Sequence, residues 1–338
     1  MAGATDGDAL QTGRATTRRS MLGAVGALAL VGPAAAQPRI HRLAYLAGGT
    51  SSASAQPQRA LFGRLEELGY REGRNLVIER RFGDGHLDRL PGLATALVAL
   101  KPDVLFASSS QATLAAIKAT STIPVVFAAV TDPEGLGVVK SLRQPGTNAT
   151  GVANQGDELQ VKLLQLLREV FPAASVVAVL YNPLNASEVR ILAALKPAAA
   201  TLGLRLRPIE VSSPSGFEPA YQRLKTERPD ALYVLAGPLM FGQRDRIVAL
   251  TNALRLPAVY GLRELVEAGG LMAYSFDLVD QFRMAAAVIA RVLRGESPST
   301  IPVEQPTRFE LILNQRTAQA QGVKFPQAVL LRADRVIE

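Results

Sequence analysis

The sequence predicts an α/β protein made of two similar doubly wound parallel-sheet lobes joined by a hinge. One observation is an internal repeat: Lys-Pro-Asp-Val-Leu-Phe at 101–106 precedes Ile-Pro-Val-Val-Phe at 123–127, and Arg-Pro-Asp-Ala-Leu-Tyr at 228–233 precedes Leu-Pro-Ala-Val-Tyr at 256–260. Such self-similarity indicates two copies of one structural unit. Strand and helix patterns also alternate along the chain, which is typical of parallel sheets covered by helices. Two facing lobes create a cleft, where small ligands prefer to bind.

The first half alternates short apolar strands with helices that carry a buried stripe. The strands are rich in Val and Leu, as expected when both faces of a sheet are covered. Prolines at 102 and 124 lie at strand entrances, where a missing N–H does least harm. We expect strands at 40–46, 75–80, 103–107 and 124–128, helices at 57–69, 87–100 and 111–120, and a short helix near 137–143.

The second half repeats this order after a turn cluster at 144–148, where the chain crosses to the other lobe. We expect strands at 176–180, 205–211, 231–235, 258–260, 271–274 and 308–313. We expect helices at 158–170, 186–202, 216–226, 241–254 and 278–294, and a short helix after Asn314.

The first 36 residues have the order of an export signal. Arg18 and Arg19 precede an apolar run at 22–32, which is followed by small residues up to Ala36. This order is that of a secretory leader, and the arginine pair indicates the twin-arginine type. We expect cleavage after about Ala36 and a periplasmic mature protein. An uncleaved N-terminal anchor is the alternative, although the run is far shorter than the ~20 residues that span a bilayer.

Composition excludes several kinds of site. The chain has no cysteine, which excludes disulfides and thiolate metal sites, and it has only two histidines. The net charge of +8 comes from scattered Lys and Arg residues, so we interpret it as a solvated basic surface and expect no nucleic-acid partner. We also expect no metal and no cofactor, and the protein should be a monomer.

Candidate ligand contacts follow from the rule that ligands bind at the carboxyl ends of parallel strands. In the first lobe these are Thr50 and Ser51, then Ser109, Ser110 and Gln111, then Thr131 and Asp132. The helix start at 109–111 can attract a carboxylate, or its serines can simply cap the helix. Asp132 can hold a ligand ammonium group or start a turn.

The matching positions of the second lobe are Asn182, Gly237, Pro238 and Tyr260. Asn182 offers both a donor and acceptors. Tyr260 offers an apolar wall with a polar tip, or is simply an interface residue.

Signs of catalysis are few. The sequence has no nucleophile elbow, no phosphate-binding loop and no His-Glu-x-x-His motif. We therefore expect no catalytic residues and no enzyme. A cleft enzyme of the doubly wound transferase type is the less favoured alternative.

Three stretches carry a family resemblance, at 123–151, 267–274 and 302–314, the last continuing to Ala333 and Asp334. Together they resemble the ABC-transporter substrate-binding proteins of the tryptophan/tyrosine type. The resemblance covers essentially the whole chain after the leader. One departure is Ser275, where the family usually has Gly.

The resemblance implies a type I periplasmic-binding fold with lobes joined by three crossing segments, near 151–154, 274–277 and 304–307. We expect lobe I at 37–151 and 275–305, and lobe II at 152–274 and 306–338. Ser275 and Asp277, on the second crossing segment, complete the candidate ligand contacts. The implied function is capture of a small solute, an amino acid or similar carboxylate, for an inner-membrane ABC permease and ATPase complex. The lobes close on it as a hinged trap. A periplasmic sensor subunit that uses the same trap is the alternative.

Overall fold

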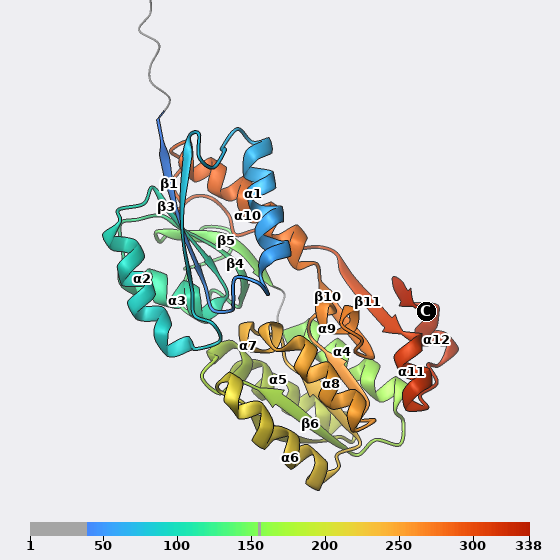
Figure 1. Cartoon of the computed structure of the whole chain (residues 1–338). Coiled ribbons are helices and arrows are strands. Elements are labelled where there is room, and N and C mark those ends of the chain that lie inside the picture. The colour runs from blue at the N-terminus through green and yellow to red at the C-terminus, as the bar shows by residue number, and fades with distance from the viewer. Residues whose placement is uncertain (1–38, 155–156) are drawn as a thin grey trace, which may run out of the picture. The chain divides into compact units, whose positions relative to one another are not determined.

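The structure is a computed structural model that describes residues 39–154 and 157–338. The leader predicted at 1–36 lies outside these residues. The described chain contains two separate sheets, each wound with helices (Figure 1). The predicted fold class, α/β with two largely parallel sheets in two lobes, is confirmed.

The first sheet has the order β2-β1-β3-β4-β5, and all of its neighbouring strands are parallel. Its strands are β1 (His41–Ala47), β2 (Leu76–Phe82), β3 (Val104–Ser108), β4 (Val125–Thr131) and β5 (Ala149–Asn154). The helices of this half are α1 (Ala55–Glu67), α2 (Leu90–Ala99) after the 3-10 turn η1 (Leu87–Arg89), α3 (Ser110–Ala119) and α10 (Leu278–Leu293).

Two cores sandwich this sheet. Leu61 and Leu65 of α1 pack with Phe282 and Ala285 of α10 against one face, and α2 and α3 cover the other. Figure 1 shows α1 and α10 side by side, although more than 200 residues separate them in the sequence. Tyr45 is fully buried at the centre of an aromatic cluster. The sequence analysis did not predict this cluster, in which Tyr45 lies next to Phe62, Phe82 and Phe106.

The second sheet has the order β12-β11-β10-β9-β8-β6-β7, and only the β10–β11 pair is antiparallel. Its strands are β6 (Val176–Tyr181), β7 (Arg205–Glu210), β8 (Ala231–Val234), β9 (Ala258–Tyr260), β10 (Met272–Phe276), β11 (Phe309–Asn314) and β12 (Arg335–Ile337). The long helices around it are α4 (Asp157–Val170), α5 (Ala186–Thr201), α6 (Phe217–Glu227) after the 3-10 turn η2 (Pro214–Gly216), and α8 (Arg244–Ala253). Four shorter helices complete it: α7 (Pro238–Gly242), α9 (Arg263–Glu267), α11 (Gln315–Gln321) and α12 (Gln327–Leu330).

Two predicted elements are wrong. No helix forms at 137–143, where Gly137 has φ +70° and the chain runs through turns. The helix predicted at 241–254 is two helices, α7 and α8, separated by Gln243. The sequence analysis also missed β5, α9, α12 and β12 as regular elements.

The chain passes between the sheets close to β5. A bridge pairs Val152 of β5 with Glu304, and Glu304 N–H donates to the Gly151 carbonyl at 2.9 Å. The passage from β10 to α10 takes a single residue, Asp277. A third connection runs from the end of α10 past Glu304 to β11. None of the helices in the described part of the chain has the length and apolar character that a membrane crossing requires.

Candidate functional site

A cavity lies where loops and helices of both sheets meet. It holds about 870 Å³ of atom-free space, counting its opening to solvent. The lining is mostly apolar, with three phenylalanines among its aromatic and aliphatic side chains. The larger apolar side chains of the lining are those of Pro57, Leu159, Ile191, Pro238, Phe241, Leu262, Phe276, Leu278 and Phe282. No charged side chain lines the cavity among the described residues.

The start of α3 faces this cavity. Ser109 has φ +121°, and its hydroxyl accepts the Ala112 N–H at 3.3 Å as the helix cap. The Ser110 hydroxyl accepts the Thr131 N–H at 3.2 Å, which ties the loops after β3 and β4 together. Both hydroxyls thus accept hydrogen bonds, and in the first turn the N–H groups of Ser110 and Gln111 remain for a ligand, because they have no partner among the described residues. Backbone N–H groups at a helix start favour an anion such as a carboxylate.

Two amide side chains reach the cavity from lobe II. Gln160 of α4 lines the cavity, and its Oε1 accepts a hydrogen bond from the Tyr233 hydroxyl at 2.7 Å. Its Nε2 is therefore left as a donor. Asn185, which caps α5, accepts a hydrogen bond from Gln111 Nε2 of lobe I. The Gln111 Oε1 and the Ser187 hydroxyl are buried without a partner among the described residues. Unsatisfied buried polar atoms in a cavity indicate where a polar ligand binds.

A third amide lies on β5. Asn154 lines the cavity, and its Oδ1 accepts a hydrogen bond from Gln281 Nε2 of α10 at 2.5 Å. The pair joins the end of the first crossing segment to the helix that follows the second. The orientation of the Asn154 amide is therefore fixed by Gln281 of α10.

Six of the predicted site residues line the cavity together: Ser109, Ser110, Gln111, Thr131, Gly237 and Pro238. Thr50 and Ser51 lie just outside the lining, although Gly49 belongs to it. Thr50 Oγ1 accepts the Ala53 N–H at 3.1 Å within its own turn.

Asp132 is not in the lining. Its Oδ1 accepts the Gly135 N–H at 2.9 Å and its Oδ2 pairs with Arg190 of α5. The sequence analysis left open whether Asp132 holds an ammonium group or starts a turn, and the structure shows the turn and an ion pair. The cause is the loop geometry, because Asp132 has φ +49°.

Asn182, Tyr260 and Ser275 are also outside the lining. Asn182 is buried in its own turn, where its Oδ1 accepts the Leu184 N–H at 2.9 Å. The Tyr260 hydroxyl lies 2.9 Å from the Thr251 hydroxyl, and the side chain is packed in the core of the second sheet. Ser275 is fully buried on β10, and its hydroxyl has no partner among the described residues.

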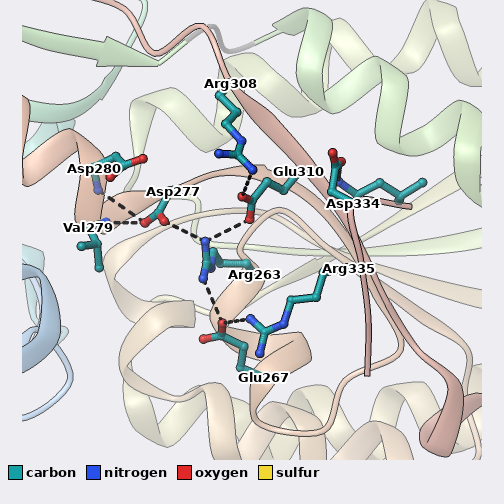
Figure 2. Close-up of polar contacts among 10 residues, drawn as sticks. Arg263, Glu267, Asp277, Val279, Asp280, Arg308, Glu310, Asp334 and Arg335 are labelled. Carbon is teal, nitrogen blue, oxygen red and sulfur yellow. Dashed lines mark hydrogen bonds and ion pairs between the residues drawn. The ribbon is translucent and has the colours of Figure 1, made fainter. Parts of the chain in front are cut away.

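Asp277 belongs to an ionic cluster rather than to the cavity (Figure 2). Its Oδ1 caps α10 by accepting the Val279 N–H at 2.8 Å, and its Oδ2 lies 2.8 Å from Arg263 Nη1. Arg263 also contacts Glu310 at 3.1 Å and Glu267 at 3.2 Å. Partial burial opposes the charge of Arg263, but the three carboxylates outweigh that effect and raise its pKa. The cluster ties the start of α10 to α9 and β11 at the connections between the sheets.

The sequence analysis missed the polar contacts Asn154, Gln160, Asn185 and Ser187 and the aromatic wall. Asn185 had one usable signal, because an Asn just before a helix is a typical cap. Gln160 had no such signal, because the orientation of its amide depends on the Tyr233 hydroxyl, which is distant in the sequence. The described residues also contain no group of three or more His, Cys, Asp or Glu side chains that could hold a metal ion.

Comparisons with known proteins point to one family. The sequence model of the family described as ABC transporter substrate binding protein matches residues 56–337. The curated "Tyrosine-binding protein" of Clostridioides difficile (strain R20291) is 28% identical over 257 residues, which covers 76% of this chain and 73% of that protein.

Two solved structures are similar over 88% of this chain and the whole of theirs. One is a conserved domain protein from Vibrio cholerae, 28% identical with a TM-score of 0.82. The other is an ABC domain in complex with L-Trp from Streptococcus pneumonia, 24% identical with a TM-score of 0.81.

Proposed function

Because this chain belongs to the ABC transporter substrate-binding proteins, a family of binding proteins and not of enzymes, we propose that it captures an aromatic α-amino acid in the cavity. The observation that carries the proposal is the pairing of two features in one cavity. The start of α3, with its backbone N–H groups, and the side chains of Phe241, Phe276 and Phe282 line the same cavity. The first suits a carboxylate and the second an aromatic ring.

The remaining polar groups suit the other end of an amino acid. The free Gln111 Oε1 is an acceptor for an ammonium group, and the Ser187 hydroxyl can accept as well. The relative from Clostridioides difficile supports the same class of ligand, because its name is that of a tyrosine binder. The Trp/Tyr class is thus favoured over sugars, which lack both charges.

Capture works by hinge closure in this proposal. We propose lobe I at 37–151 and 275–305 and lobe II at 152–274 and 306–338, with hinges at the three crossing segments. A ligand that contacts both lobes stabilises the closed form over the open one. An inner-membrane permease and ATPase complex then takes the solute from the closed protein. We also propose that the protein acts as a monomer.

The direct test is a thermal and calorimetric screen of the purified chain from residue 37 onward, against the twenty L-amino acids and a set of sugars. L-tyrosine, L-tryptophan or L-phenylalanine should raise Tm, since a ligand that binds only the folded state stabilises it. Phe276→Ala should weaken that binding, while a substitution at the exposed Leu331 should not. A panel in which no aromatic amino acid raises Tm refutes the proposal.

Export is a separate proposal. We propose that residues 1–36 direct the chain through the twin-arginine route to the periplasm, with cleavage after about Ala36. Replacing Arg18 and Arg19 with Lys in a leader–reporter fusion should keep the reporter in the cytoplasm. Export of the double-Lys leader at the wild-type rate contradicts the twin-arginine assignment.

A further inference from the structure

A carboxyl group is buried directly behind the cavity. Glu188, in the first turn of α5, is 0% exposed and does not itself line the cavity. Its Oε1 accepts a hydrogen bond from Asn185 Nδ2 and its Oε2 accepts one from the Asn182 N–H, both at 2.7 Å. Burial raises the pKa of Glu188 to about 8, although both hydrogen bonds act in the opposite direction. A carboxyl group is costly to bury, so this position calls for an explanation.

Glu188 lies against two loop segments next to the cavity. Asn182 and Asn185 belong to the connection between β6 and α5, and Gly237 follows β8. Gly237 lies so close to Glu188 Oε1 that a Cβ atom at position 237 would overlap this oxygen. The absence of a side chain at 237 is therefore what lets the carboxyl group reach its two donors.

The carboxyl group also fixes the orientation of the Asn185 amide. Its Nδ2 must face Glu188, because the carboxyl oxygen is the acceptor there. Its Oδ1 accepts the Ser187 and Glu188 N–H groups at 3.0 and 3.3 Å as the cap of α5. The same Oδ1 accepts a hydrogen bond from Gln111 Nε2. A reversed Asn185 amide would place its Oδ1 against the acceptor oxygen of Glu188, and its Nδ2 against the N–H donors of Ser187, Glu188 and Gln111.

The order of donors and acceptors then continues into the cavity. Since Gln111 Nε2 faces Asn185, Gln111 Oε1 is the atom left for the ligand, and it has no partner among the described residues. We propose that Glu188 is a positioning residue which, through Asn185, sets the Gln111 amide so that Oε1 accepts a hydrogen bond from an N–H group of the ligand. The identity of that group as an α-ammonium rests on the function proposed above, whereas the relay of orientations does not.

The relay is tested first without ligand. Glu188→Gln removes one of two acceptors, so one N–H group of Asn182 or Asn185 must face another N–H group. The matched control is Glu264→Gln on α9, because Glu264 is half-buried, desolvation raises its pKa to about 7, and it does not line the cavity. The readout is the pair of side-chain amide NMR signals of Gln111, assigned by their loss in Gln111→Ala. We expect them to shift in Glu188→Gln and not in Glu264→Gln, and unchanged signals in Glu188→Gln overturn the proposal.

Calorimetry supplies the second test. Wild-type protein is titrated with L-tyrosine and with 3-(4-hydroxyphenyl)propionate, which lacks the ammonium group. Glu188→Gln should lower the affinity for L-tyrosine about tenfold, which is the effect of one mispaired buried hydrogen bond. It should leave the affinity for the propionate nearly unchanged. In the double variant with Gln111→Ala the losses should not add, because both act on one contact. Equal losses for the two ligands, or additive losses in the double variant, overturn the relay.

The two proposals fail separately. If the wild-type protein binds no amino acid while the Gln111 signals still shift in Glu188→Gln, the proposed function fails and the relay stands. If Glu188→Gln does not fold, Gln111→Ala on the cavity wall replaces it. That variant must lower the affinity for L-tyrosine and spare the propionate, and an equal effect on both ligands overturns the role of Gln111 Oε1.

Discussion

Arg263 should be one of the most important charged residues for the stability of this protein. It contacts three carboxylates, those of Asp277, Glu310 and Glu267, at 2.8, 3.1 and 3.2 Å, and only 17% of its side chain is exposed. Figure 2 shows it between the start of α10 and the start of β11. Arg263→Met removes the charge while keeping much of the apolar stem. The substitution leaves Asp277 without its cation beside the chain passage between the sheets.

The cost can be worked out from these contacts. A hydrogen bond to a charged group contributes about 1.5–3 kcal/mol, and breaking a buried ion pair costs about 3–5 kcal/mol. The three carboxylates are partly exposed, and Arg335 still lies 2.8 Å from Glu267, so the lower end applies. We expect a loss of about 3 kcal/mol in the free energy of unfolding. In a chain of this size that lowers Tm by roughly 5 °C.

Thermal and urea unfolding of the purified chain from residue 37 measure this loss. Arg308→Met is the matched control, because Arg308 contacts Glu310 at 3.5 Å but its side chain is 78% exposed. An exposed pair contributes about 0–1 kcal/mol, so the control should unfold almost as the wild type does. If Arg263→Met is as harmless as Arg308→Met, the reasoning about this cluster is wrong.

Three further substitutions or conditions test other parts of the structure. Gly151→Ala should lower the free energy of unfolding by at least ~2 kcal/mol, because Gly151 has φ +156° and a Cβ there would lie 2.6 Å from the Phe127 N. A urea midpoint equal to that of the wild type contradicts this packing. The free energy of unfolding should fall as pH rises from about 5 to 8, because the pKa of Glu188 is raised from 4.5 to about 8 and the folded state keeps a proton that the unfolded chain has lost. Glu188→Gln should flatten this dependence of the free energy of unfolding on pH. An equal dependence in the variant refutes the assignment. Arg190→Met should speed ligand release by no more than about fivefold, since its pair with Asp132 joins the lobes but is partly exposed; stopped-flow release rates decide this, and a much larger effect places Arg190 in ligand contact.

The fold could be predicted because its signals are local. The strand at 258–260 was predicted with the bounds that β9 has, and most helix limits differ from the structure by one to three residues. What failed depends on neighbours that the local sequence does not show. β5 carries Gly151 and few large apolar side chains, and it is a strand because β4 pairs with it and Glu304 bridges to it. The segment 137–143 was predicted as a helix, but Gly137 takes φ +70° and the chain runs through turns there.

The candidate site divides in the same way. The strand-end rule found the loop at 109–111 and the segment at 237–238, because carboxyl ends of parallel strands share one edge of a sheet. The rule could not say which side chain in a loop turns inward. Asp132 lies outside the cavity because it pairs with Arg190, and Asn185 lines the cavity, where it bonds Gln111. In both pairs the two residues are more than 50 positions apart in the sequence.

An uncharged cavity can still select a zwitterion, and this explains why the ionic residues predicted for the site lie elsewhere. A charged side chain in the wall would remain unpaired whenever the cavity is empty, which is costly in a poorly hydrated space. Amides and helix N–H groups avoid that cost, because they are dipoles fixed by the fold: Gln160 by the Tyr233 hydroxyl, and Gln111 by Asn185. Their orientation must then be set by groups behind the wall. The buried carboxyl group of Glu188 and the ionic cluster around Arg263 lie outside the cavity, where they hold its loops and its connections in place.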